Sequence, residues 1–236
     1  MLPGGRDLEN NPFRGKKAEK YDTFFSTEYG RKVFKLEKEI LLELLNPFKN
    51  SLILEVGCGT GIWIKALKGE RFHEPVGLDI SADMLRIARK KGLKKLVRGT
   101  ALNLPFRDNS FDLTLFITSL EFIPDRVKAF TEALRVTKKG IVVAFLNRYS
   151  LLNLVRSLKS ALSDSVYSYT RFLTIGELQR IALSASRITG KKAVLSSFKT
   201  TLNFTSGSFV SYKLEKRLGF NSPFGAFGAA LFRVEG

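Results

Sequence analysis

The chain has 236 residues, of which 44% are hydrophobic, and this is enough to bury the core of one large domain. A single cysteine and a single histidine exclude an internal disulfide framework and a zinc site built from several such ligands, so the chemistry is expected to be metal-free or to use carboxylates. The formal net charge of +17 predicts attraction to polyanions or acidic substrates without identifying one.

Residues 1–50 are predicted to form a polar arm, an aromatic stretch and a covering helix that stops at Asn46 and Pro47. No secretory signal and no apolar run of roughly 18 to 20 residues is present, which predicts a cytoplasmic protein without a membrane span. The helix carries apolar residues at helical spacing, namely Val33, Leu36, Ile40, Leu41 and Leu44. The aromatic stretch is either a lid over a ligand or a staple that holds the helix to the core, and it contains Tyr21, Phe24, Phe25 and Tyr29.

Strand and helix patterns alternate between residues 51 and 146. The predicted strands lie at 52–56, 75–79, 94–98, 111–118 and 141–146. The predicted helices lie at 61–68, at 82–91 after Ser81 and before Gly92, and at 125–138 after Asp125 and before Gly140. This repeated βαβ order predicts a Rossmann-like α/β fold, in which a mostly parallel sheet has helices on both faces.

The pattern changes after residue 146. Residues 147–190 are expected to form a small inserted helical cover, and one of its helices starts with a capping box of Thr174 and Glu177. Two late β-rich runs, at 191–204 and 229–236, would complete a seven-stranded sheet as a hairpin-like pair. We therefore expect a single domain, 1–236, made of an N-terminal arm and cover helix (1–50), a core (51–146), an inserted cover (147–190) and C-terminal strands (191–236).

The segment LILEVGCGTGIWI, at residues 52–64, places Gly57, Gly59 and Gly61 directly after the first predicted strand. Glycines at this spacing stabilise neither a strand nor a helix, so they indicate a ligand close to the backbone and to the start of the next helix. The strand at 75–79 ends in Asp79, a carboxylate placed to accept hydrogen bonds from both hydroxyls of a ribose. Loop and carboxylate together predict a nucleoside cofactor.

The spacing of the glycines disfavours nicotinamide and ATP cofactors. A GxGxxG fingerprint needs a glycine where Ile62 stands, and no GxxxxGKS lysine is present.

Five segments resemble, in chain order, the successive motifs of class I S-adenosylmethionine-dependent methyltransferases. They are ILEVGCGTG, GLDIS, GTALNLPFRDNSFDLTLF, SLEFIPD and ALRVTKKG. The resemblance covers about residues 51–146, and YDTFFSTEYGRKVFKLEKE is similar to the N-terminal segment of a subgroup of this family. It implies S-adenosyl-L-methionine as cofactor.

The resemblance also implies where each part of the cofactor lies. Glu55 and the glycine loop would hold the amino acid part, and Asp79 the ribose. Thr100 stands where the family usually has an aspartate that accepts from the adenine amino group, so the backbone nearby is expected to share that role. The strand-four end, Thr118 to Leu120, would run beneath the methionine part. The predicted cofactor-binding residues are Tyr21, Glu55, Gly57, Cys58, Gly59, Gly61, Asp79, Ile80, Thr100, Ala101, Leu102, Thr118 and Ser119.

No catalytic residue is identified by the sequence. Many relatives have a histidine where Phe122 stands, so their proposed base is absent here. His73 precedes the second strand, at the opposite edge of the sheet from the expected cofactor. Cys58 lies in the glycine loop, whose backbone is expected to face the cofactor, so packing explains a small residue there. An NPPY-like run, typical of adenine amino methylation, does not follow the fourth strand.

The acceptor is expected to be a small molecule enclosed by the helical cover, and RNA is the alternative because the chain is basic. Residues 86–98 contain seven Lys or Arg and either contact a phosphate backbone or form a solvated face. A protein that binds the cofactor without catalysis and a nicotinamide dehydrogenase are the remaining readings. Several basic and aromatic side chains after the fifth strand could contact the acceptor, and the basic ones could bind an acidic group on it. They are Arg148, Arg156, Lys159, Arg171, Tyr149, Tyr167 and Tyr169.

Overall fold

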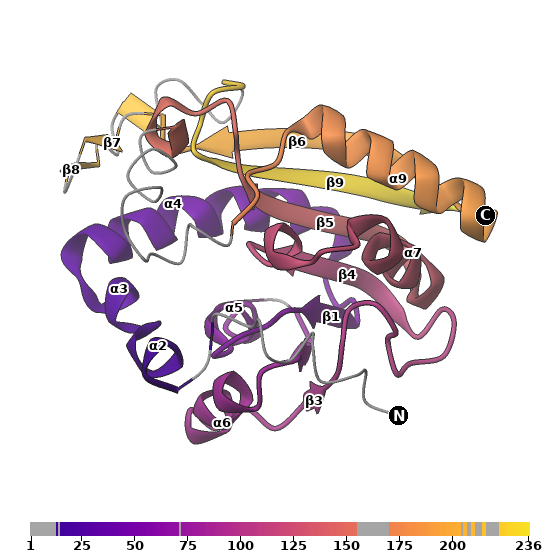
Figure 1. Cartoon of the computed structure of the whole chain (residues 1–236), viewed down its shortest axis with the longest axis horizontal. Coiled ribbons are helices and arrows are strands. Elements are labelled where there is room, and N and C mark those ends of the chain that lie inside the picture. Colours follow the sequence, from indigo (N-terminus) through magenta and orange to yellow (C-terminus); the bar gives the residue numbers. More distant parts are fainter. Residues whose placement is uncertain are drawn as a thin grey trace.

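Seven strands form one sheet in the order β3-β2-β1-β4-β5-β9-β6, as the computed structural model shows (Figure 1). The structure describes residues 13, 15–70, 72–154, 170–203, 205–206, 209–210, 214–215 and 222–236. The strands are β1 (Ile53–Val56), β2 (Val76–Asp79), β3 (Leu96–Arg98), β4 (Phe111–Ile117), β5 (Thr137–Leu146), β6 (Lys192–Thr201) and β9 (Phe227–Glu235). β9 lies between β5 and β6 and runs antiparallel to both, whereas the other neighbouring strands of this sheet pair in parallel. The predicted mostly parallel seven-stranded sheet is thus confirmed.

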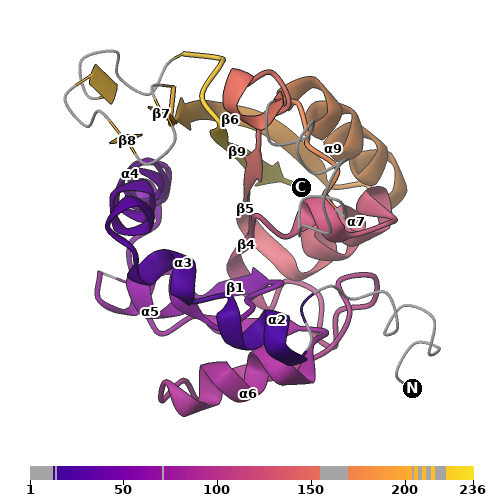
Figure 2. The same ribbon diagram turned by 60° about the vertical axis from the view of Figure 1, so that its left-hand side comes forward.

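Helices cover both faces of the sheet (Figure 2). The helices α4 (Glu28–Leu45), α5 (Ile62–Lys68) and α6 (Ala82–Lys90) lie on one face, and α7 (Arg126–Val136) and α9 (Ile175–Thr189) lie on the other. The α4 helix buries all five residues predicted from its spacing. It ends at Leu45, where a 3-10 turn (Asn46–Phe48) with proline begins, because proline cannot continue an α-helix. Two short helices, α2 (Gly15–Lys20) and α3 (Thr23–Ser26), precede it.

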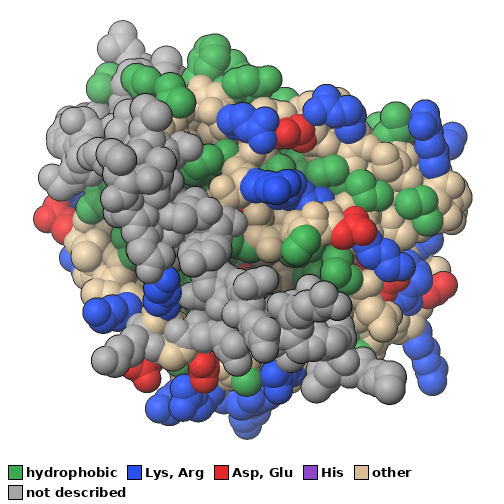
Figure 3. Space-filling model, in the orientation of Figure 1, with side chains coloured by type: hydrophobic (Ala, Val, Ile, Leu, Met, Phe, Trp, Pro, Cys, Tyr) green, Lys and Arg blue, Asp and Glu red, His purple; other side chains and the backbone are tan. Residues whose placement is uncertain are grey.

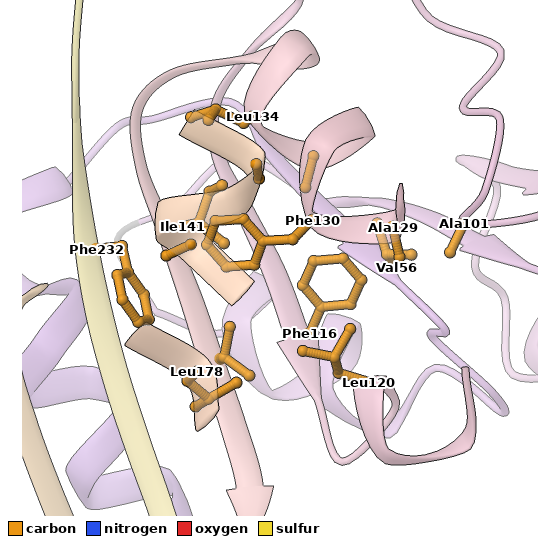
Figure 4. Packing of buried hydrophobic residues seen from close by; sticks show 14 of the residues in the cluster. Val56, Ala101, Phe116, Leu120, Ala129, Phe130, Leu134, Ile141, Leu178 and Phe232 are labelled. Carbon is orange, nitrogen blue, oxygen red and sulfur yellow. The ribbon is translucent and has the colours of Figure 1, made fainter. Parts of the chain in front are cut away.

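The core alternates between the two faces of β5. Ile141, Val143 and Phe145 belong to the cluster beneath α7 and α9, whereas Val142 and Ala144 belong to the cluster beneath α4. Figure 4 shows Phe116, Phe130 and Phe232 among the side chains of the first cluster. This two-sided burial follows from side chains pointing to opposite faces at successive positions, and it is typical of a strand inside a parallel sheet.

The prediction for residues 125–141 was wrong at its boundary. The helix ends at Val136 and β5 already begins at Thr137, so Gly140 lies inside a strand and not at a helix end. A Cβ at Gly140 would approach the Phe232 carbonyl oxygen at 3.2 Å and Leu113 Cδ2 at 3.3 Å. The glycine therefore allows close packing between neighbouring strands, and this reason is visible only once the strands are paired.

Part of the predicted cover forms a face of the sheet. The α9 helix begins with the predicted capping box, in which Thr174 N–H donates to Glu177 at 2.8 Å and Glu177 N–H donates to Thr174 Oγ1 at 3.2 Å. It packs beside α7 and against β6 (Figure 1). Tyr149 is exposed. Four other predicted acceptor contacts lie outside the described residues, namely Arg156, Lys159, Tyr167 and Tyr169.

The late β-rich runs pair as predicted, with β9 antiparallel to β6 over nearly their whole length. Between them, β7 (Thr205–Ser206) and β8 (Phe209–Val210) form a separate two-stranded sheet. Within the described ranges, no helix has the length and apolar character needed to cross a bilayer.

Candidate cofactor site

A cavity of about 260 Å³ opens at the carboxyl ends of β1, β2 and β4, where parallel strands direct their following loops. It is lined by residues of the glycine loop after β1, of the strand end after β2 and of the strand end after β4. Twelve of the thirteen predicted cofactor-binding residues line it, namely Tyr21, Glu55, Gly57, Cys58, Gly59, Asp79, Ile80, Thr100, Ala101, Leu102, Thr118 and Ser119. The tertiary structure therefore brings together residues that are nearly a hundred positions apart in the chain.

Two carboxylates lie in this cavity on neighbouring strands, Glu55 in β1 and Asp79 at the end of β2. Asp79 accepts hydrogen bonds from Gly59 N–H at 2.7 Å and from Ser81 N–H at 2.8 Å, and these bonds fix its orientation. Glu55 is 1% exposed, and its Oε2 has no hydrogen-bond partner in the described part of the chain. A buried polar atom without a partner is costly, so this oxygen indicates a donor supplied by a ligand.

The electrostatics of the cavity favour a cationic ligand group. Burial, and then the charge of Asp79, raises the pKa of Glu55 well above its usual value. Burial also raises the pKa of Asp79, although backbone N–H donors oppose that rise. A cationic group that pairs with Glu55 lowers the pKa of this carboxyl group again, because it stabilises the charged carboxylate.

The glycine loop works by its shape. Gly57, Gly59 and Gly61 all have positive φ, at 77°, 53° and 74°. The N–H groups of Gly57 and Cys58 donate to the Leu78 carbonyl at 2.7 and 3.0 Å, and that of Gly61 donates to Cys58 at 2.9 Å. These donors, like that of Gly59, are engaged in hydrogen bonds within the protein. What the loop offers instead is a backbone that lets a ligand approach closely.

Gly61 is the one predicted residue that does not line the cavity. It caps the start of α5, and a side chain there would collide with Leu93 Cδ1. Its glycine therefore serves packing between the loop and the segment after α6. The prediction that it contacts the cofactor is not supported by its position.

The part of the cavity where the adenine is predicted to lie is lined by apolar residues and by Thr100. Its hydroxyl oxygen accepts from Leu102 N–H at 3.2 Å, which holds the turn at Ala101 and Leu102 against the cavity. Ile80 and Met84 line the same cavity from the end of β2 and the first turn of α6. The apolar lining suits one face of a planar base, as the sequence predicts for Ile80.

The end of β4 is held in an unusual conformation. Thr118 has φ of 46°, which is uncommon for a β-branched residue, and its N–H donates to Ala144 at 2.8 Å. Ser119 donates to the Val56 carbonyl at 2.7 Å, and thereby ties β4 to β1 across the cavity. These bonds fix the strand end where the methionine part of a cofactor is predicted.

The aromatic stretch around Tyr21 both lines the cavity and packs against the core. Tyr21 lines the cavity, and burial raises its pKa, with the nearby carboxylates Glu37 and Glu55 adding to the rise. From Tyr21, ring contacts at 4.6 to 5.8 Å between centroids run through Phe25 and Phe34 to Trp63 in α5. The segment therefore covers the cavity and is anchored to the core at the same time.

A polar latch holds this segment against the glycine loop. Asp22 accepts from the Thr60 hydroxyl at 2.6 Å and pairs with Lys91, whose ammonium also donates to the Thr60 carbonyl at 3.0 Å. Farther back, Ser81 donates to the Phe13 carbonyl at 2.8 Å. Ligand exchange is therefore expected to require opening of these contacts.

Several cavity residues were missed from the sequence. Phe13 stands in the arm and carries no pattern that points to a site, yet its ring meets those of Tyr21 and Phe122. Phe122, Ile123 and Pro124 belong to the motif SLEFIPD, so the motif was the available signal. They lie beside the expected methionine end, where an acceptor would enter.

The two alternative nucleophiles or bases stay unsupported. His73 is exposed and precedes β2, away from the carboxyl ends of the strands. Burial, and then the charges of Glu55 and Asp79, raises the pKa of the Cys58 thiol well above its usual value, which opposes a thiolate nucleophile. No cluster of three His, Cys, Asp or Glu residues suited to a metal occurs in the described ranges.

Glu121 is a buried carboxylate that sequence reasoning passed over. It belongs to a 3-10 turn (Leu120–Phe122), is 1% exposed, and its Oε1 accepts from Leu146 N–H at 2.8 Å. Its Oε2 has no partner among the described residues. Burial raises its pKa to about 7, although the Leu146 bond and the charge of Arg126 oppose the rise. The sequence feature that could have indicated this residue is a charged residue within the otherwise mostly apolar motif SLEFIPD.

Replacing Glu121 by glutamine is expected to change the pH dependence of stability. The pKa of Glu121 rises from 4.5 to about 7 on folding, so the native state holds the proton more tightly. The resulting stabilisation is complete below about pH 4.5 and is lost as the pH rises to about 7, a change on the order of 3 kcal/mol. Glu121→Gln stays neutral, so urea denaturation should show it gaining stability relative to the parent across this range.

Glu132 is the matched control, because its pKa shifts the other way. Burial acts to raise it, but Arg135 and the Leu104 N–H lower it below its usual value. Glu132→Gln should therefore lose stability relative to the parent as the pH rises from the acid range. The same sense of change in both variants would contradict the assignment for Glu121.

Comparison with known proteins agrees with this geometry. A family model described as a methyltransferase domain matches residues 54–145. A demethylmenaquinone methyltransferase of Lactiplantibacillus plantarum is 42% identical over 100 residues, and the match spans 39% of this chain and 42% of that protein. An uncharacterized protein of Methanocaldococcus jannaschii is 34% identical over 165 residues, covering 69% of this chain and 75% of its own length.

A solved structure extends the likeness to almost the whole chain. The S-adenosylmethionine-dependent methyltransferase of Thermotoga maritima, described as a possible histamine N-methyltransferase, has a TM-score of 0.70 and 26% sequence identity. The match covers 92% of this chain and 96% of that one. Motifs, strand order and these relatives agree, and the chain belongs to the class I S-adenosylmethionine-dependent methyltransferase family.

Proposed function

We propose that the protein moves the methyl group of S-adenosyl-L-methionine to a nucleophile on a small-molecule acceptor by direct displacement. The observation that carries this proposal is the buried pair of Glu55 and Asp79 in one cavity, with an oxygen of Glu55 lacking a partner in the described part of the chain. An ammonium group satisfies Glu55, and two ribose hydroxyls suit the remaining lone pairs of Asp79. The residues present therefore fit the cofactor of the family.

The cofactor supplies an electrophilic methyl group on a sulfonium, which is already a good leaving group. The protein's part is then to orient donor and acceptor, and alignment of this kind can supply about 7 kcal/mol or more of the barrier. Thr118 and Ser119 fix the strand end beneath the donor, and Phe122 with its neighbours excludes water beside it. The residues that line the cavity include no histidine or lysine, so positioning is the main contribution we assign to them.

Two lines support a small acceptor over RNA. Two of the relatives reported above are named for small molecules, one as a demethylmenaquinone methyltransferase and one as a possible histamine N-methyltransferase. In addition, part of the basic run at 86–98 is engaged within the protein, since Arg86 pairs with Asp83 and Lys91 with Asp22. The matches to the quinone enzymes span 42% to 64% of the length of those proteins, which is less than two thirds, so their particular acceptor does not transfer to this chain.

The test uses cofactor carrying a labelled methyl group together with an extract of the cells from which the protein comes. We expect label in the metabolite fraction, with incorporation that changes little at raised salt, whereas non-specific RNA binding falls steeply with salt. Label in nuclease-sensitive RNA at a defined nucleotide would overturn the choice of acceptor. Cofactor binding without any labelled product in the metabolite, lipid, RNA or protein fractions would favour the non-catalytic reading.

A further inference from the structure

Four arginines gather at the carboxyl ends of β4 and β5, beside the donor cavity. Arg126 is the first residue of α7, Arg148 follows β5, Arg171 precedes α9, and Arg180 lies within α9. Both helices begin at this edge of the sheet, because each leads into or follows a parallel strand. Figure 3 shows Lys and Arg side chains on the part of the surface formed by α7 and α9. Acceptors of open α/β sheets bind at this edge.

Hydrogen bonds bring three of these residues together. The Arg126 guanidinium and the Arg171 backbone N–H both donate to the Glu121 carbonyl oxygen, at 3.4 and 3.3 Å. Arg148 donates to the Phe172 carbonyl at 3.1 and 2.8 Å. A second cavity, of about 190 Å³, lies between α7 and α9 and is lined by Arg126, Val127, Leu173, Glu177, Arg180, Ile181 and Ser184.

Positive charge at this place is only partly neutralised. Arg148 pairs with Glu177 at 3.0 Å, but Arg126, Arg171 and Arg180 have no carboxylate partner within the described ranges. Burial, and then the positive charge of Arg171, lowers the pKa of Arg126, although Glu121 and Glu177 oppose this. Unneutralised guanidinium groups held close together repel one another, and an anion that binds between them removes this cost.

We infer that Arg126, Arg171 and Arg180 bind an anionic group, a phosphate or a carboxylate, of the acceptor. The guanidinium group suits this role because its planar set of donors matches both groups in bidentate geometry. Ile123 and Pro124 line the donor cavity, and Arg126 follows two residues later at the second cavity. An acceptor anchored here by its anionic end can therefore direct its nucleophile toward the donor cavity. This inference rests on the proposed methyl transfer.

The size of the second cavity favours a small acceptor over a polynucleotide. It is bounded by two packed helices and has a volume of about 190 Å³. That volume is enough for one compact anionic group. A chain of nucleotides needs a groove that follows several phosphates, and its affinity depends on many cations at once.

The test measures anion binding directly, by titration calorimetry with pyrophosphate and, separately, with malonate at about 0.15 M salt, where surface attraction is screened. The variant is Arg171→Gln/Arg180→Gln, because neither guanidinium makes a hydrogen bond or ion pair within the described residues and folding should be kept. We expect affinity for at least one probe to fall ten-fold or more. The probe that binds more tightly distinguishes a phosphate from a carboxylate. Adding Arg126→Gln to this variant should lower the affinity for the anion further.

The matched control is Arg187→Gln/Lys192→Gln, which removes the same charge near the other end of α9, where both residues are exposed. It should leave anion affinity within two-fold. Equal losses in variant and control, or no saturable binding of either probe, would overturn the inference. The inference would also be overturned if a single-stranded RNA oligonucleotide bound the parent protein and lost affinity in the Arg171→Gln/Arg180→Gln variant, while neither pyrophosphate nor malonate bound.

The demethylated cofactor, S-adenosyl-L-homocysteine, is titrated into the same proteins to separate this inference from the proposed function. If the double variant and the control bind S-adenosyl-L-homocysteine as tightly as the parent does, the cofactor site is intact in all three proteins. A loss of anion affinity in the double variant is then caused by the removal of Arg171 and Arg180. A parent protein that binds neither the cofactor nor its product would contradict the methyl transfer and the acceptor role with it.

Discussion

Replacing Asp79 by asparagine is expected to weaken binding of S-adenosyl-L-methionine at least ten-fold. The carboxylate lies in the cavity at the end of β2 and would accept two charge-assisted hydrogen bonds from the ribose. If each bond loses about 1.5 kcal/mol, the affinity falls by roughly 150-fold. Titration calorimetry with the cofactor, with its demethylated product and with NAD measures the effect. The parent protein should bind the first two ligands and not NAD.

Asp112 provides the control for this prediction. It too is a carboxylate that accepts a backbone N–H, from Leu52 at 2.9 Å, but it lies near the start of β4 and does not line the cavity. Asp112→Asn should therefore leave cofactor affinity unchanged while it costs some stability. Equal affinity in the Asp79 variant and the parent would show that this carboxylate does not hold the ribose. NAD binding without a response to either sulfur nucleoside would contradict the cofactor assignment altogether.

Gly59→Val is expected to reduce cofactor affinity by roughly ten-fold to a hundred-fold. Gly59 has φ of 53°, lines the cavity, and a Cβ built on it meets no protein atom within 4 Å. A valine side chain would therefore extend into the space where the cofactor is proposed to lie, and overpacking of this kind costs about 1–3 kcal/mol. The left-handed backbone adds strain, which lowers the stability of the folded protein.

Gly92 separates these two effects. It has φ of 85°, and a Cβ there also meets nothing within 4 Å, but it lies after α6 and does not line the cavity. Gly92→Val should lose a similar amount of stability in thermal unfolding and keep full cofactor affinity. If both variants lost affinity to the same degree, the loss would come from backbone strain, and the loop would have no special role in binding.

The donor and acceptor halves of the molecule differ in how far relatives describe them. The matches to the quinone enzymes cover 39% to 56% of this chain, and the family model covers residues 54–145. Arg148, Arg171 and Arg180 all lie beyond residue 145, outside the family model. Of the three arginines proposed to bind the acceptor, Arg171 and Arg180 lie outside the family model and Arg126 lies within it, so an anionic acceptor is compatible with a cofactor site shared with these relatives.

The N-terminal segment both lines the cavity and is fastened to the glycine loop. Tyr21 lines the donor cavity, while Asp22 binds Thr60 and Lys91, so the residue that touches the site and the residue that fastens it are neighbours in the chain. Lys91 belongs to the basic run that the sequence offered as an RNA contact. Its ammonium is engaged in this structure by the lid, which gives that part of the run a structural reason.

The sequence alone determined the core strands of the sheet, the glycine loop after β1 and the position of the Asp79 carboxylate at the end of β2. Such features are local, since an apolar run, glycines at a turn and a charge at a strand end are each read from a few neighbouring residues. The capping box at Thr174 and the buried face of α4 were predictable for the same reason. Each depends on residues no more than a few turns apart.

Only the tertiary structure decided the features that depend on residues far apart in the chain. It placed Gly140 inside β5, since the close approach of β4 and β9 appears only when the strands pair. It removed Gly61 from the cavity and brought Phe13 into it. It also joined Arg126 to Arg171 at one carbonyl oxygen, across 45 positions of sequence. Local propensity carries no information about such contacts, because they are set by how the helices and strands pack against one another.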